Sequence, residues 1–180
     1  MKKSIIYYGL ISGLIVSAML ILTTSLCYNN PNFQDQGSMY VGFGGIIVAF
    51  SMIFAGVKNF RDKHNQGVIT FSKAFKLGFY IAFIASTMYV VTWLIEYYAF
   101  IPDFMDKYAA HELKKIHSGG YSQAEINDKI ADMNGYKEMY KNPAYIVLLT
   151  YMEILPLGLV LSLISALIFK KKTNSNLASD

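Results

Sequence analysis

Residues 144–169 read AYIVLLTYMEILPLGLVLSLISALIF, and this stretch decides the fold of the chain. Glu153 is the only charged residue in it. The hydrocarbon core of a bilayer is about 30 Å thick, and a helix of about 20 apolar residues spans it. Because lipid offers the backbone no hydrogen-bond partner, a crossing segment has to satisfy its own polar groups, as a helix does. The stretch therefore predicts a transmembrane helix.

Three earlier stretches have a comparable length and the same apolar character. They cover about residues 4–27, 38–57 and 75–101. Only Glu96, near the end of the third stretch, places an acid inside one of them. We therefore predict an all-α fold, an integral membrane bundle of four transmembrane helices that forms a single membrane domain over residues 1–180.

The composition excludes several classes of protein. Of the 180 residues, 54% are hydrophobic and 16% are charged, whereas a soluble domain carries about 25% charge. That balance excludes an intrinsically disordered chain and argues against an ordinary soluble enzyme. The one cysteine, Cys27, excludes a disulfide framework and a cysteine-based zinc site within a single chain.

The first stretch has an alternative interpretation as a cleaved signal peptide, because Lys2 and Lys3 form a basic start. Its 24 uncharged residues exceed the apolar region of a signal peptide, which is about 7 to 15 residues long. A lipoprotein signal has a small residue before its cysteine, and here Leu26 precedes Cys27. We therefore expect a retained span.

Lysine and arginine in the connections orient the spans. The N-terminus, the connection over residues 58–76 and the tail over residues 170–180 carry two, five and three of them. All three segments lie on the same side of a four-span bundle, which predicts that both termini are cytoplasmic. Residues 102–143 carry six basic and seven acidic residues, so their charges balance. Because the basic residues lie at the ends of spans, the net charge of +4 does not indicate a nucleic-acid partner.

Residues 102–143 are too long for a bare loop, and they contain helix signals. Gly119 and Gly120 suit the C-terminus of a helix. Ser122 and Glu125 have the spacing of a capping box, which begins a second helix. We therefore predict an extracytoplasmic helical hairpin between the third and fourth spans.

Small residues recur at intervals of four in the spans, which allows helix backbones to approach closely in lipid. The helix-packing positions that stand out are Gly9, Gly13, Gly78 and Gly158. The same faces suit packing within one chain and association into a homo-oligomer, and both interpretations remain open.

Glu153 lies nine residues into the fourth span, roughly 14 Å deep and close to the bilayer midplane. A charged carboxylate costs on the order of 3 kcal/mol there, so we expect it to be protonated, hydrogen-bonded or exposed to a wet cavity. The candidate intramembrane polar site comprises Glu153, Pro156, Tyr89, Thr92 and Ser17. Two interpretations remain open: proton or cation coupling, and a structural hydrogen bond between helices.

Glu96 is the second acid within a span. It lies near the outer end of the third stretch, where Trp93 and Tyr97 suit a membrane interface. We expect this interfacial acid to extend toward the headgroups.

The chain lacks the motifs of common enzymes, such as a phosphate-binding glycine loop, Gly-x-Ser-x-Gly or His-Glu-x-x-His. His111 and His117, six positions apart, fall on different faces of a helix. We therefore expect no enzyme activity, no catalytic residue, no metal and no cofactor. The basic connection over residues 58–76 also contains phenylalanines and would suit contact with anionic lipid, although orientation already explains its charge.

Four segments of the chain resemble a known family. They read YGLISG at 8–13, FSKAFKLG at 71–78, PDFM at 102–105 and EILPLG at 153–158, the last leading into SLISA at 162–166 and a lysine tail. Over nearly its whole length the chain resembles a family of small four-span bacterial membrane proteins catalogued as domain of unknown function number 4199. The resemblance implies a multi-pass protein of the bacterial inner (plasma) membrane with cytoplasmic termini. It implies no activity.

The leading hypothesis is a non-enzymatic integral membrane protein that acts through partner binding or self-association. Its expected partners are the lipid bilayer and either a second copy or another membrane protein, with no nucleic acid. The alternative is a small transporter or channel subunit that uses Glu153 for proton or cation coupling.

Overall fold

The computed structural model describes residues 1–29 and 38–171. Helix accounts for 89% of them, and no strand occurs among them, which confirms the predicted all-α class. Residues 30–37 of the predicted first connection and residues 172–180 of the predicted tail lie outside the described ranges.

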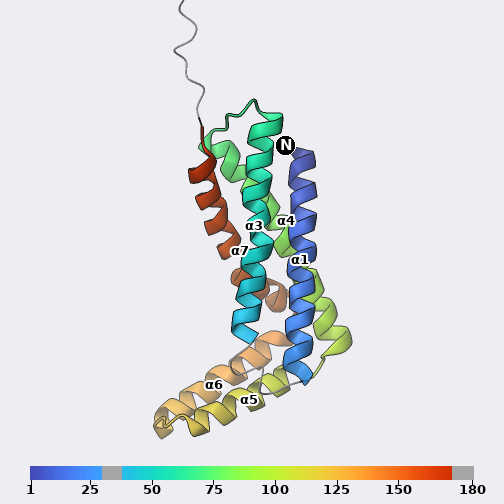
Figure 1. The fold of residues 1–180 in the computed structure, drawn as a ribbon. Helices are drawn as coiled ribbons and strands as arrows, with labels where there is room; N and C mark the ends of the chain where they lie inside the picture. Colours follow the sequence, from blue (N-terminus) through green and yellow to red (C-terminus); the bar gives the residue numbers. More distant parts are fainter. Residues whose placement is uncertain (30–37, 172–180) are drawn as a thin grey trace, which may run out of the picture. The chain divides into compact units, whose positions relative to one another are not determined.

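Four helices in the described ranges are long and apolar enough to cross a membrane, which confirms the four-span character (Figure 1). They are α1 (Lys2–Asn29), α3 (Ser38–His64), α4 (Phe71–Ile95) and α7 (Pro143–Phe169). A short π-helical segment, η1 (Glu96–Phe100), follows α4 directly. The shortest of the four long helices has 25 residues, which is enough for a bilayer core of about 30 Å.

The helix α3 continues past the predicted stretch 38–57, and α4 begins before the predicted stretch 75–101 and ends at Ile95, where η1 takes over. The last turn of α3 contains Arg61, Lys63 and His64. Basic side chains stabilise the C-terminus of a helix because they complement its dipole, and this effect favours continuation of α3 past the apolar stretch. The connection between α3 and α4 is therefore short and covers residues 65–70.

The described chain forms two compact units. The span unit comprises Met1–Thr92 and the residues from Tyr151 onward, and the hairpin unit comprises Trp93–Thr150. The helices α4 and α7 each run from one unit into the other. A single domain over the whole chain stays a prediction.

Side chains from all four long helices form the core of the span unit, with Val16 as the contribution of α1. Phe50 and Ile53 of α3 and Ile154 of α7 are fully buried, as is Ile81 of α4. The buried Ser12 of α1 donates a hydrogen bond of 2.7 Å to a backbone carbonyl of α3. Because lipid is as apolar as these side chains, such helices associate through close packing and interhelical hydrogen bonds.

The close approach of the helices depends on glycine. A Cβ atom at Gly158 of α7 would lie 2.8 Å from the Cβ atom of Ala82 in α4. At Gly13 of α1, an added Cβ atom would overlap Met88 of α4. Added Cβ atoms at the other two predicted packing positions, Gly9 and Gly78, would lie 2.9 and 3.1 Å from side chains of neighbouring helices. All four glycines therefore serve contacts within the chain.

The hairpin unit holds two further helices, α5 (Phe104–Ser118) and α6 (Gln123–Tyr140). An ion pair of 2.6 Å joins Lys137 Nζ of α6 to Asp106 Oδ1 of α5. Gly120, between the helices, has a φ of +71°, which glycine adopts without a steric penalty. Residues 102–143 therefore contain two helices joined at the predicted glycines, and the extracytoplasmic location of this hairpin stays a prediction.

The helix α6 begins with the predicted capping box. The backbone N–H of Ser122 donates to Glu125 Oε2 at 2.9 Å, and the backbone N–H of Glu125 donates to Ser122 Oγ at 3.4 Å. The backbone hydrogen bond from Ser122 lowers the pKa of Glu125. The charged carboxylate thus binds a backbone donor that the helix itself leaves unsatisfied.

Candidate functional site

Glu153 lies near the middle of α7, and its side chain is exposed on the surface of the chain. It lies ten positions after Pro143, the start of the helix, which corresponds to about 15 Å at 1.5 Å per residue. Within the described part of the chain, its carboxylate has no hydrogen-bond or ion-pair partner. Halfway along an apolar helix there is therefore a carboxylate that no described residue pairs with.

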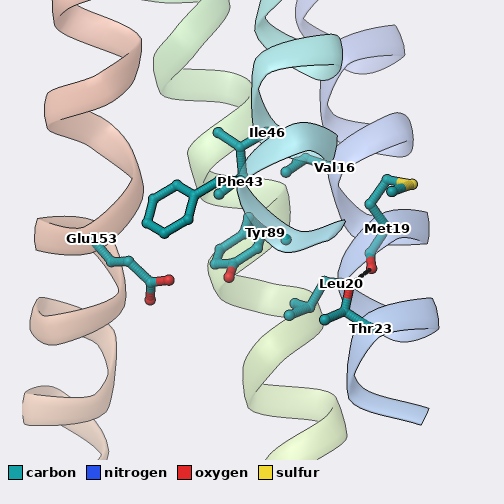
Figure 2. A pocket seen from close by; sticks show the side chains of 9 residues that line it. Val16, Met19, Leu20, Thr23, Phe43, Ile46, Tyr89 and Glu153 are labelled. Atoms are coloured by element: carbon teal, nitrogen blue, oxygen red, sulfur yellow. Dashed lines mark hydrogen bonds between the residues drawn. The ribbon is translucent and has the colours of Figure 1, made fainter. Parts of the chain in front are cut away.

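An open cavity of about 200 Å³ lies beside this carboxylate (Figure 2). All four long helices line it, with Val16, Met19, Leu20 and Thr23 from α1, Gly42, Phe43 and Ile46 from α3, Tyr89 from α4 and Glu153 from α7. Figure 2 shows the Glu153 carboxylate and the Tyr89 hydroxyl turned toward the same space. We call this space the Glu153 cavity.

The walls of the Glu153 cavity are mostly apolar. Thr23 donates a hydrogen bond of 2.8 Å to the carbonyl of Met19 in its own helix, so its hydroxyl is already engaged. Phe43 is 54% exposed and Gly42 has no atom within 4 Å of an added Cβ position. The cavity therefore combines an open apolar face with one carboxylate and one phenol.

The other predicted members of the polar site separate into different places. Thr92 Oγ1 lies 2.9 Å from Ser17 Oγ and 2.9 Å from the carbonyl of Met88. This pair joins α1 to α4 and does not line the Glu153 cavity. Pro156 is exposed on α7 and does not line the cavity either. Of the predicted set, the structure brings together Glu153 with Tyr89, and Ser17 with Thr92.

Two polar contacts of α7 were not predicted. The hydroxyl of Tyr151 donates a hydrogen bond of 2.8 Å to Thr87 Oγ1 of α4. Thr150 donates to the carbonyl of Ile146 in its own helix at 2.7 Å. No sequence motif distinguishes Tyr151, or the cavity residues Met19 and Phe43, from other residues of the spans. Apolar and aromatic residues are common everywhere in a transmembrane helix. Their roles follow from contacts between helices.

Glu96 lies in η1 within the hairpin unit, and only 8% of the residue is exposed. The chain itself therefore encloses this acid, which does not match the expected extension toward the headgroups. The neighbouring rings of Trp93 and Tyr97 pack at an interplanar angle of 43°, with centroids 6.2 Å apart. Tyr97 also packs on Tyr140 of α6, at 5.6 Å between centroids. Aromatic packing in the unit thus joins the end of the third span to α6.

Comparison with known proteins identifies the family. The family model described as "Protein of unknown function (DUF4199)" matches residues 7–171. The chain belongs to this family. The DUF4199 match covers every residue of the Glu153 cavity. No curated protein and no solved structure matches the chain.

The chemistry available to this DUF4199 protein at the Glu153 cavity is limited. A carboxylate can accept hydrogen bonds, bind a cation or take up a proton. In the described part of the chain, no group of three His, Cys, Asp or Glu residues is placed to hold a metal ion. A single carboxylate beside a phenol therefore suits recognition of a donor or a cation.

Proposed function

We propose that this chain is a non-enzymatic integral membrane protein whose Glu153 cavity receives a transmembrane segment of another protein. The observation that carries the proposal is the exposed Glu153 carboxylate in the middle of α7, which has no partner in the described chain. An intramembrane carboxylate costs about 2.5 to 3.5 kcal/mol on insertion scales, so it is retained where it serves an interaction. A donor or cationic side chain from a partner would offset that cost.

The absence of basic residues from the spans favours a different protein, and not a second copy of this chain, as the partner of Glu153. The stretches 4–57, 77–106 and 142–169 contain no Lys, Arg or His. A second copy of the chain therefore offers no cation at the depth of Glu153. The open apolar walls, and the absence of a side chain at Gly42, allow a helix to approach closely. We assign the cavity to a partner helix that carries a basic or amide side chain near its middle.

Photocrosslinking at Phe43 tests this assignment. A photoreactive phenylalanine analogue at position 43, on the exposed edge of the cavity, is expected to yield a discrete adduct heavier than the chain. The same analogue at Val48, which is exposed on α3 but does not line the cavity, is the matched control. The adduct is expected to disappear in a Glu153→Leu background. A mass equal to two copies would favour self-association instead, and equal yields at both positions would refute a specific cavity.

Proton or cation coupling is the second candidate, because the Tyr89 hydroxyl and the Glu153 carboxylate face the same space (Figure 2). Glu153→Gln separates the two candidates, since glutamine keeps the size and hydrogen bonding but does not titrate. Coupling requires that this variant lose a pH-dependent phenotype or flux. Partner binding instead predicts that the adduct at position 43 persists at a lower yield, because the amide still accepts a hydrogen bond but carries no charge.

We also infer a location in a bacterial inner membrane, with both termini cytoplasmic and the α5–α6 hairpin outside the cytoplasm. The concentration of Lys and Arg at the ends of α3 and α7 supports this orientation. An alkaline phosphatase fusion at Gly120 is expected to be active, and one after Lys171 inactive. A cytoplasmic reporter should give the opposite pattern, and a reversal of both reporters would refute the orientation.

A further inference from the structure

One end of the span unit gathers basic side chains from three segments that are distant in sequence. We call it the basic end. Its members are Lys58, Arg61 and Lys63 of α3, Lys73 and Lys76 of α4, and Lys170 and Lys171 after α7. Asp62 is the acid among the described residues of these segments. Seven positive charges therefore face one negative charge where three of the long helices begin or end.

A backbone contact holds the end of α7 against the connection between α3 and α4. The N–H of Ile69 donates to the carbonyl of Lys171 at 3.0 Å, and the N–H of Lys171 donates to the carbonyl of Ile69 at 2.8 Å. Ile69 is 1% exposed, so this contact is part of the packed unit. The Arg61 guanidinium carbon also lies 5.3 Å from the ring centroid of Phe169. The position of Lys171 is thus fixed by the fold.

Two of the seven basic side chains have partners among the residues that the structure describes. Arg61 pairs with Asp62 at 2.6 Å. Lys73 Nζ donates to Asn65 Oδ1 at 2.8 Å and lies 5.2 Å from the centroid of the Phe60 ring. These contacts orient the connection and leave the exposed lysines to face outward. The exposed members are Lys58, Lys63, Lys76, Lys170 and Lys171.

Lys58 and Lys171 lie far apart in the sequence, and both act electrostatically on the carboxylate of Asp62. That single carboxylate is already bonded to Arg61. Among the described residues of the span unit, the excess positive charge at the basic end is therefore not balanced by acids, and it favours an external anion. Because the basic end lies at the termini of membrane-spanning helices, the anions at its level are phosphates of lipid headgroups.

We propose that the basic end binds the phosphodiester headgroup of an anionic phospholipid. Lysine is a point charge that binds phosphate from several directions, and its stem lies along apolar surface while the amine reaches the headgroup. Phe71, at the start of α4, is 38% exposed and offers a surface for an acyl chain. Orientation of the spans requires basic residues only somewhere on one side. It does not require the backbone contact that places Lys171 beside the α3–α4 connection.

The test compares lipids on the purified full chain in a neutral detergent. Phosphatidylglycerol is expected to raise the thermal unfolding temperature and to remain bound in native mass spectrometry, whereas phosphatidylcholine does neither. In the triple variant Lys58→Gln, Lys170→Gln and Lys171→Gln, retention of phosphatidylglycerol is expected to fall about tenfold or more, since each lysine near a lipid surface contributes on the order of a fivefold change. Retention should also fall with added salt.

Two controls keep the result specific. The triple variant Lys114→Gln, Lys129→Gln and Lys141→Gln removes the same charge from the hairpin unit and should retain the lipid as the wild type does. Replacing Lys58, Lys170 and Lys171 by arginine keeps the charge and should preserve retention, which separates binding from misfolding. Equal loss in the two glutamine variants, or equal retention of both lipids by the wild type, would overturn the proposal. So would an equal thermal shift with inorganic phosphate alone, which would assign the site to a free anion.

Discussion

Glu153→Leu is expected to stabilise the isolated chain by about 2 kcal/mol while it abolishes capture of the partner. The stabilisation follows because the carboxylate makes no hydrogen bond or ion pair in the described chain, so its removal costs no internal contact. Leucine also extends the apolar surface of the Glu153 cavity. A residue whose replacement raises stability but abolishes binding is typical of a functional site. Selection retains a destabilising residue where it serves activity.

The measurement is reversible unfolding in mixed micelles, together with the yield of the adduct at position 43. Met152→Leu is the matched control, since Met152 is the preceding residue of α7 and is 66% exposed. This variant is expected to change neither stability nor yield. If Glu153→Leu instead destabilised the isolated chain by a similar amount, the carboxylate would be a structural hydrogen-bond acceptor, and the partner proposal would lose its main support.

Gly158→Leu is expected to destabilise the span unit by about 3 kcal/mol or more. An added Cβ atom at this position would lie 2.8 Å from the Cβ of Ala82 and 3.1 Å from the ring of Phe50. Ala82 is fully buried, and its Cβ is attached directly to the backbone of α4. No rotamer change can therefore relieve the overlap, and α7 has to move away from α4.

Gly44→Leu is the control for this prediction. Gly44 lies in α3, and no atom lies within 4 Å of its added Cβ position. Leucine has a higher helix propensity than glycine, so the control is expected to leave stability unchanged or slightly raised. The check is the unfolding midpoint of both variants in the same micelles. Equal losses would mean that glycine at position 158 is not needed for close packing.

The helix-packing glycines show why pattern alone leaves questions open. The sequence places Gly9, Gly13, Gly78 and Gly158 at spacings that suit an oligomer as well as a single bundle. In the structure, each of them faces a side chain of another helix in the same chain. Gly42 and Gly44 have the open positions instead. The spacing predicts which face of a helix carries small residues. What packs against that face is known only from the folded bundle.

The polar site shows the same division. Depth along each span suggests one site that contains Glu153, Tyr89, Thr92 and Ser17. The structure divides these residues between the Glu153 cavity and a separate contact of Thr92 with Ser17. Depth is a property of the distance along one helix, whereas contact also depends on the rotation of each helix about its axis. That rotation is set by packing.

The chain's amino-acid order was sufficient to predict an all-α class, four spans, the α5–α6 hairpin and its capping box. These features depend on the length of apolar runs and on bonds between residues that are close in sequence, so no tertiary information is needed. Three features required the folded chain: the lack of a partner for Glu153 among the described residues, the open cavity beside it and the backbone contact of Lys171 with Ile69. Each of these features depends on the relative placement of residues that lie tens of positions or more apart in the sequence. Such contacts are decided by how whole helices pack.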